Sequence, residues 1–328
     1  MLSSNSNRQG GIALISVLWL LLLLTVLASG LSVNSRNQAR QSGNIAIATR
    51  LQQGAEAGLQ LALLALAQSA EQQPWLADGS LHGVPFNDME VYLALFNESG
   101  RIDLNTAGPE LLNGLLATVE PDDALRARLT DAIMDWRDGD DLRRLNGAEL
   151  DDYLAAGLDY GPANAPFTSV EELQKVLEMT PELYRQIRHS LTLRNPRPGI
   201  NPQFAPRQVL LALPGVSEAT VDQFIEDRRA RFEAGQPPPA TELFPSGLLS
   251  GGAPGVNYTI YTEARMNTVY RYRLTASLLN RRGRPLVLKA EQEFVPLFTD
   301  IPPDGDALWM GSKLPAGLAG MAATWRSN

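Results

Sequence analysis

The stretch that decides the fold is IALISVLWLLLLLTVLASGL, residues 12–31. None of its twenty residues is charged. At about 1.5 Å of rise per residue, a helix of this length matches the roughly 30 Å hydrocarbon core of a bilayer, so we expect one membrane span. A short polar leader, residues 1–11, precedes the span and ends in Gly10-Gly11. A secretory signal peptide is cut after its apolar run, so this leader predicts a different kind of processing.

The helical pattern continues beyond the span. Apolar residues recur three or four positions apart with polar residues between them, which predicts an amphipathic helix. These apolar residues are Ile47, Leu51, Ala55, Leu59, Ala62 and Leu66. The pattern lasts to about Gln73, and Pro74 cannot continue a helix. We therefore expect one anchor and stalk helix over residues 12–75.

Two later regions predict strands. Residues 89–96 (MEVYLALF) are rich in β-forming side chains, and a turn at 97–100 separates them from 101–104, which predicts a hairpin. Strand patterns return at residues 256–265, 269–279 and 285–294, with turns at 266–268 and 280–283. Because an isolated hairpin is marginal in water, we expect one small antiparallel sheet that covers the apolar stripe of the helix.

The residues between the two strand regions have helical patterns that repeat. Residues 102–107 (IDLNTA) and 200–205 (INPQFA) each lead into two short helices, and a third pair begins at 167–173 (FTSVEEL). Short helix pairs of this kind stack to share a core, and they resemble helix–hairpin–helix modules. The expected fold class is therefore α+β, with residues 105–239 as an inserted all-α domain.

The N-terminal pattern resembles the class III leader and stalk of type IV pilins and type II secretion pseudopilins. The resemblance implies a pilin-like fold, cleavage between Gly11 and Ile12 by the prepilin peptidase, and methylation of the mature chain. These families usually place Glu five residues into the mature chain, where this sequence has Ser16. The minor pseudopilin K of type II secretion systems is the subunit that usually lacks this Glu. The chain is similar to that family over residues 8–294.

That resemblance implies a structural role without enzymatic activity. A K subunit forms the tip of the periplasmic pseudopilus with minor pseudopilins I and J, above the other pseudopilus subunits. Its single span lies in the inner membrane and its globular part in the periplasm. The alternative is a minor pilin-like subunit of a type IV pilus or a DNA-uptake machine, because leader and stalk would look the same.

The charges beside the span leave its orientation open. Arg8 lies on the leader side, whereas Arg36, Arg40 and Arg50 follow the span. The positive-inside rule alone favours the reverse orientation, and an ordinary N-terminal signal anchor is a further interpretation. A periplasmic body is expected because the leader must meet the peptidase in the cytoplasm, and that step rests on the resemblance.

An acidic segment is the one candidate ligand site. It consists of residues 135–141 (DWRDGDD), 147–153 (GAELDDY) and 162–167 (PANAPF). Carboxylates on an irregular loop can converge on Ca²⁺, although the spacing is not that of an EF-hand and a solvated loop is the alternative. The K family is similar in its D-W-x-D-x-D and G-A-E-x-x-x-Y elements, which implies calcium. We expect Asp138, Asp140, Glu149 and Asp152 as ligands, with Asp135 held on its own helix.

Other functions find little support in the sequence. A net charge of −8 and a pI near 5.0 disfavour a polyanion partner. The best phosphate-binding hairpin, residues 213–220, has Glu218 where a basic residue is expected, and an acid repels phosphate. There is no cysteine, and His82 and His189 are isolated in sequence. Phosphate-binding and hydrolase motifs are missing as well. We expect neither a nucleic-acid-binding protein nor an enzyme.

The expected organisation follows from these patterns. It comprises a leader (1–11), a transmembrane and stalk helix (12–75), the first part of a pilin-like sheet (76–104), the helical insertion (105–239), the remaining strands (240–295) and a flexible tail (296–328). The tail is rich in Pro and Gly and lacks any period. Trp309 and Trp325 are its candidate anchors on a partner.

Overall fold

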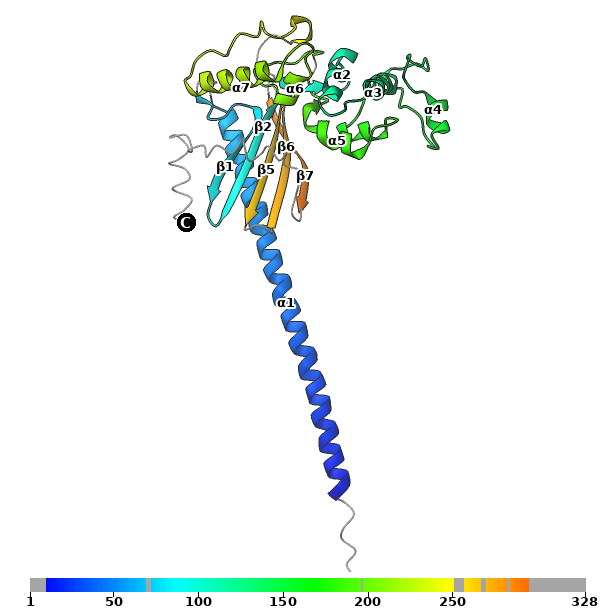
Figure 1. Cartoon of the computed structure of the whole chain (residues 1–328). Helices are drawn as coiled ribbons and strands as arrows, with labels where there is room; N and C mark the ends of the chain where they lie inside the picture. The colour runs from blue at the N-terminus through cyan, green and yellow to red at the C-terminus, as the bar shows by residue number, and fades with distance from the viewer. Residues whose placement is uncertain are drawn as a thin grey trace, which may run out of the picture.

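The computed structural model describes residues 10–68, 72–195, 197–250, 257–266, 270–281 and 284–294. Most of the predicted leader and the whole predicted tail lie outside these residues. Within them the chain forms one long helix, a five-stranded sheet packed on that helix, and a block of short helices at one end of the sheet (Figure 1). The expectation of an α+β chain with an antiparallel sheet is confirmed.

Helix α1 spans Gly10–Leu66, and its second half lies on the sheet. The stripe of α1 that is buried there consists of Leu51, Ala55, Leu59, Ala62 and Ala65. Two glycines beside this stripe set the distance between helix and sheet. A Cβ added at Gly58 would lie 2.6 Å from Cγ1 of Val91, and one added at Gly54 would lie 2.4 Å from Sδ of Met89. A larger side chain at either position would force the side chain opposite it, or the helix itself, to shift.

The expected end of this helix near Gln73 is wrong, because α1 stops at Leu66. Trp75 and Ala77 are buried in the same core as the second half of α1. The chain therefore has to leave the helix axis early enough to turn back into the first strand at Asp78.

The first half of α1 extends away from the sheet (Figure 1). Large apolar side chains between Leu14 and Leu27 are 53–67% exposed. Among the described residues, we find no helix whose apolar stretch is long enough to cross a membrane. The single span expected over residues 12–31 stays a prediction.

The sheet has the strand order β1-β2-β5-β6-β7, and every neighbouring pair is antiparallel. The strands are β1 (Asp78–Phe86), β2 (Met89–Asn97), β5 (Tyr258–Met266), β6 (Tyr270–Arg281) and β7 (Arg284–Phe294). The last three lie where the sequence predicts them. Strand β1 was not predicted, because Gly79, Gly83 and Pro85 are poor strand formers. It lies at the edge of the sheet, where a proline costs no ladder hydrogen bond.

The expected hairpin between 89–96 and 101–104 is wrong. Ile102–Asp103 (β3) leaves the sheet and pairs in parallel with Leu191–Thr192 (β4) inside the helical block. The cause is a 3-10 turn over Glu98–Gly100, which redirects the chain after β2. Asn97 caps this turn by accepting a hydrogen bond from the Ser99 N–H at 3.0 Å.

The helical block has a single core of its own. Its helices are α2 (Pro109–Ala117), α3 (Asp123–Arg137), α4 (Leu150–Ala155), α5 (Pro181–Ile187), α6 (Arg207–Leu211) and α7 (Glu218–Glu233). Two of the three predicted pairs form as α2–α3 and α6–α7, whereas the third begins with a 3-10 helix over Val170–Lys175. Phe244, beyond the last helix, also packs in this core, with its ring centroid 4.8 Å from that of Phe224. The helix–hairpin–helix likeness stays a prediction.

Among the described residues, a fully buried ion pair joins the block to the sheet. Nη2 of Arg228, on α7, lies 2.6 Å from Oδ2 of Asp78 at the start of β1, and the two side chains are 3% and 7% exposed. Nη1 of the same arginine donates to the carbonyls of Pro202 at 2.7 Å and Ala205 at 2.9 Å. Burial of these charges is tolerated only because each is paired and hydrogen-bonded.

Candidate functional site

The acidic segment links α3 to α4 and continues from α4 to Phe167, at the side of the block away from the sheet (Figure 1). Its three parts are held together by buried aromatic rings. The Trp136 ring lies with its centroid 6.1 Å from Tyr153 and 6.1 Å from Phe167. Each ring belongs to one of the three acidic stretches, so the aromatic core gathers their oxygens into one loop cluster.

Asp135 fixes the backbone of the loop that follows α3. Its side chain is fully buried, and Oδ2 accepts hydrogen bonds from the backbone N–H groups of Arg144 at 3.2 Å and Ala148 at 3.0 Å. Gly147 makes this possible, because a Cβ at that position would lie 1.8 Å from the same oxygen. Asp135 therefore holds the loop in its fold, as expected for a residue held on its own helix.

The four predicted ligands divide into two kinds. Asp140 and Asp152 serve the local fold: Asp140 accepts from the Leu142 N–H at 2.9 Å, and Asp152 accepts from the Glu149 N–H at 3.0 Å while it contacts Arg143 at 2.9 Å. Asp138 and Glu149 are different. Within the part of the chain that the structure describes, each has a buried carboxylate oxygen that receives no hydrogen bond.

Sequence reasoning missed one residue of this cluster, Asn164. Its Nδ2 donates to Asp141 at 2.7 Å, and its Oδ1 is buried without a donor among the described residues. Its backbone φ of +46° lies in the left-handed region, which asparagine tolerates better than most residues. The available signal was its place in residues 162–167 (PANAPF), the third part of the acidic segment.

The carboxylates of the cluster repel one another. The pKa of Glu149 is raised to about 7, mainly by burial and then by the negative charges of Asp135 and Asp138. Arg144 offsets part of this repulsion, because its guanidinium lies 3.2 Å from Asp135 and 3.4 Å from Asp138. Buried oxygens without donors beside a carboxylate that resists ionisation fit a hard divalent cation.

The cluster is not a preformed cage. Among the described residues, no three side chains of the metal-binding types are grouped closely enough to hold an ion. Any cation would have to draw Asp138 and Glu149 together and compete with Arg144 for Asp138.

A second feature lies between the block and the sheet, a cavity of about 700 Å³ that we name the joint cleft. It is lined by residues of four chain segments: Glu98, Arg101 and Asn105; Phe167–Glu171; Tyr184, Arg188, His189 and Leu191–Arg194; and Thr259, Tyr261, Arg273, Thr275 and Ser277. These positions are far apart in sequence, so no local motif predicts the cleft.

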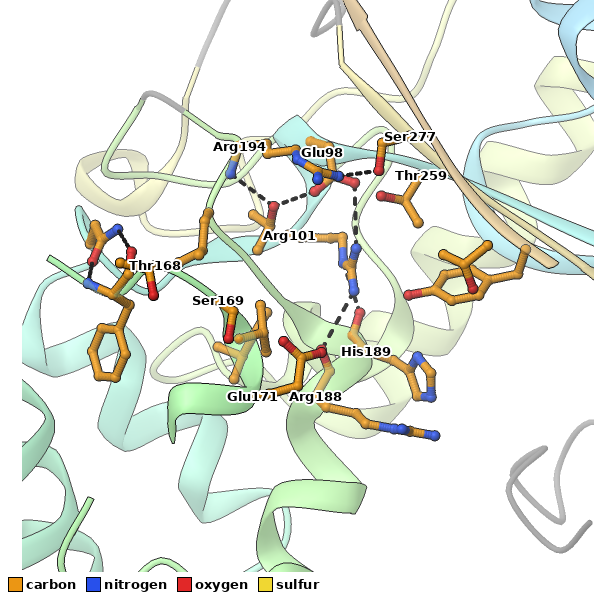
Figure 2. A pocket seen from close by; sticks show the side chains of 18 of the residues that line it. Glu98, Arg101, Thr168, Ser169, Glu171, Arg188, His189, Arg194, Thr259 and Ser277 are labelled. Carbon is orange, nitrogen blue, oxygen red and sulfur yellow. Dashed lines mark hydrogen bonds and ion pairs between the residues drawn. The ribbon is translucent and has the colours of Figure 1, made fainter. Parts of the chain in front are cut away.

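Arg101 forms the inner wall of the joint cleft (Figure 2). Its Nε donates to the carbonyl of His189 at 2.8 Å, and its Nη1 lies 3.4 Å from Glu98. Glu98 in turn accepts from the Thr192 hydroxyl. The pKa of His189 is lowered to about 3, first by burial and then by the positive charges of Arg188, Arg101 and Arg273. Two of these arginines are paired with acids, Arg101 with Glu98 and Arg273 with Glu263 at 3.2 Å.

The hairpin over residues 213–220 is built as a helix cap. Gly215 has a φ of +75°, and the Ser217 hydroxyl accepts from the Thr220 N–H at 3.2 Å at the start of α7. Glu218 lies 3.1 Å from Arg207, and Arg207 also contacts Asp222 at 2.6 Å. The basic side chain beside this hairpin is thus already paired with two carboxylates.

Comparison with known proteins gives one consistent result. A family model described as type II secretion system (T2SS), protein K, matches residues 93–197, which hold the acidic segment and much of the joint cleft. Type II secretion system protein K of Klebsiella pneumoniae is 28% identical over 203 residues, which are 56% of this chain and 62% of that protein. The chain therefore spans less than two thirds of that relative. The protein of the same name from Pseudomonas aeruginosa is 27% identical over 240 residues, 65% of this chain and 72% of the relative.

A solved structure shares the fold. The crystal structure of the GspK-GspI-GspJ complex from the type 2 secretion system of enterotoxigenic Escherichia coli matches with a TM-score of 0.50 and 14% identity. The match covers 79% of this chain and 99% of the other chain.

Proposed function

We propose that the chain is a type II secretion system protein K, the structural tip subunit of a periplasmic pseudopilus, because the family model and the curated relatives of that name match it. The observation that carries this proposal is the place of the helical block. The block lies at the end of the sheet farthest from the start of α1 (Figure 1). Subunits that stack along their long helices would meet this block from above, so it fits only where no further subunit follows.

Minor pseudopilins I and J are the proposed partners in the tip complex. The shared fold with a chain of the GspK-GspI-GspJ complex supports this assignment. The remaining pseudopilus subunits would lie below the complex, against the stalk. Isolation of the tagged chain together with its bound partners tests this tip role. A subunit of a type IV pilus or a DNA-uptake machine would bring different partner proteins with it.

The first half of α1 is proposed to anchor the chain in the inner membrane. Its large apolar side chains between Leu14 and Leu27 are 53–67% exposed, so they need an apolar environment that the chain itself does not provide. The globular part would then face the periplasm. The prepilin peptidase would act at Gly11 and Ile12, which lie in the first turn of α1.

Calcium is the proposed ligand of the acidic segment. Asp138 and Glu149 would supply the charged oxygens, and the Asn164 amide oxygen is suited to complete them, since Ca²⁺ accepts carbonyl as well as carboxylate ligands. Asp140 and Asp152 remain candidates at the edge of the site, where they would first have to give up their present hydrogen bonds. A bound cation would remove the repulsion that raises the pKa of Glu149.

Millimolar Ca²⁺ is expected to raise the melting temperature of the full chain in detergent by several degrees. A ligand that binds only the folded state stabilises it by about 2.7 kcal/mol at a hundredfold excess over Kd. Mg²⁺ should do much less, because it demands tight octahedral geometry. Thermal unfolding with and without chelator measures the effect. Asp138→Asn combined with Glu149→Gln should abolish it, whereas Asp151→Asn, in the first turn of α4, should leave it intact.

The calcium effect should also depend on pH in a defined direction. Without the ion, Glu149 binds its proton more tightly in the folded than in the unfolded state, so its contribution to stability is present at low pH and is lost as pH rises toward about 7. Binding needs the deprotonated form, so the gain from Ca²⁺ should be larger above pH 7 than at pH 5. A gain that is equal at both pH values, or that survives the double substitution, would mean that these acids are only a solvated surface.

A further inference from the structure

A second cavity, of about 430 Å³, lies within the helical block, and we name it the α2–α3 cavity. It is lined by one face of α2, around Asn113, by one face of α3, around Thr130, by Asn146 and by Pro214 of the hairpin over residues 213–220. The wall is closely packed where α2 meets the hairpin, because a Cβ added at Gly114 would lie 1.9 Å from the Ala212 carbonyl oxygen. The size is within the range of about 300–1,000 Å³ that is usual for ligand sites.

One buried polar group in this wall lacks a partner. Thr130 is only 4% exposed, and its Oγ1 takes part in no hydrogen bond with a described residue. Threonine within a helix can donate to the carbonyl one turn back, and buried hydroxyls are nearly always hydrogen-bonded. The Thr130 hydroxyl is therefore available to a polar group that enters the cavity.

The charged side chains of the wall are both acids. Glu110, in the first turn of α2, is exposed, and Asp131, on α3, is half-buried. Asp131 accepts hydrogen bonds from the backbone N–H and the Nδ2 of Asn146, at 3.0 Å each, and both are received by the same oxygen, Oδ2. Neither acid forms an ion pair with a residue of the described chain. The cavity therefore favours a cationic occupant.

The rest of the wall favours a guanidinium group on an alkyl stem. Pro109 and Pro214 offer apolar surface that suits a chain of methylene groups. The amides of Asn113 and Asn146 and the hydroxyl of Thr130 add polar groups to the two carboxylates. An ammonium has three donors, whereas a guanidinium has five in a fixed plane and is more weakly hydrated. A guanidinium can therefore satisfy more of this wall.

We propose that the α2–α3 cavity binds an arginine side chain of a partner polypeptide. Glu110 and Asp131 would receive the guanidinium, Thr130 would gain its missing hydrogen bond, and the stem would lie along the two prolines. Free arginine fits less well, because its own carboxylate would be repelled by the same acids, whereas an arginine within a peptide carries no such charge. The site does not depend on the tip role, since all of its walls belong to the helical block.

NMR of the full chain in detergent, labelled with ¹⁵N-threonine, tests this proposal. The probe is the peptide acetyl-Ala-Arg-Ala-amide at millimolar concentration, with chelator present so that no divalent cation competes. The Thr130 signal, identified by its loss in Thr130→Ser, should shift in a saturable way, and the signal of Thr49, on the stalk, should not. No shift of the Thr130 signal would overturn the proposal.

Three further probes separate the features of the occupant. The same peptide with citrulline, which keeps the shape of arginine but not its charge, should cause no shift; an equal shift would overturn the role of charge. The lysine peptide and free arginine should both bind more weakly than the arginine peptide. Equal binding of the lysine peptide would overturn the assignment to guanidinium, and equal binding of free arginine would overturn the assignment to a polypeptide.

A matched pair of substitutions tests the acids of the wall. Glu110→Gln should weaken binding of the arginine peptide about tenfold, because it removes a charged acceptor. It should not disturb the fold, since Glu110 is exposed and has no ion-pair partner among the described residues. Glu226→Gln is the control, because Glu226 is also an exposed glutamate on a helix but lies outside the cavity. Equal affinities of the two variants would overturn the proposed site.

Discussion

Arg228→Met is expected to lower the free energy of unfolding by about 3–5 kcal/mol, the usual cost of removing one partner from a buried ion pair. The substitution leaves the Asp78 carboxylate buried, with the Ser80 N–H at 2.9 Å as its one remaining donor among the described residues. It also strips the carbonyls of Pro202 and Ala205 of their guanidinium donor. Urea unfolding of the full chain in detergent, followed by tryptophan fluorescence, measures the loss.

A matched substitution on the same helix shows whether burial is the cause. Arg231 pairs with Asp227 at 2.9 Å, but both side chains are about 40% exposed or more. Arg231→Met should cost at most about 1 kcal/mol, because exposed ion pairs contribute little. Equal losses of unfolding free energy for the two variants would contradict the role given to the buried Arg228–Asp78 ion pair. Adding Asp78→Asn to Arg228→Met should recover part of the loss, since it removes the uncompensated charge.

Gly11→Leu is expected to abolish processing and, with it, secretion. Glycine lets the backbone at the cut site be approached closely, whereas a leucine side chain would obstruct the peptidase. On the proposed topology, the unprocessed chain would keep its eleven leader residues, including Arg8, on the cytoplasmic side of the membrane. Mass spectrometry of the extracted chain should show the intact precursor, and the culture supernatant should lack the exported proteins.

The control for this variant is Gln9→Ala, which changes the leader but not the bond that is cut. It should give a mature chain beginning at Ile12 and normal secretion. A mature N-terminus at Met1 in the unaltered chain, or one beyond Leu31, would contradict the pseudopilin assignment, because the anchor would then be processed by another route or lost.

Periodicity was sufficient for much of the fold. The stripe from Leu51 to Ala62 is buried on the sheet as its spacing requires, because a helix on a sheet can bury only one face. The three strands near the C-terminal end lie where their alternation and turns place them. These elements were predictable because local pattern and tertiary packing agree.

The errors arose where packing overrides local pattern. Strand β1 is rich in glycine and proline, and it forms because β2 offers it an edge. Residues 101–104 have a strand pattern but pair inside the helical block, because the turn after Asn97 and the buried Arg101 direct the chain there. The pairing of Ile102 is not visible from the local pattern, since its partner Leu191 lies about ninety positions away.

The sequence predicts where the candidate calcium site lies, but not which of its oxygens are available to an ion. Carboxylate density and the family resemblance indicated the loop. Which oxygens lack hydrogen bonds depends on the backbone, so Asp140 and Asp152 looked the same in the sequence as Asp138 and Glu149. Asn164 had only its place in residues 162–167 as a signal, and the joint cleft, which is lined by segments far apart in sequence, had none.

The tip assignment is tested most directly by isolating the affinity-tagged chain from native membranes and identifying its partners by mass spectrometry. Minor pseudopilins I and J should co-purify in amounts comparable to the tagged chain, because the three would form one tip complex. The major pseudopilin should be scarce by comparison. Recovery of type IV minor pilins or DNA-uptake proteins in their place, or of no pilin-like partner at all, would contradict the account.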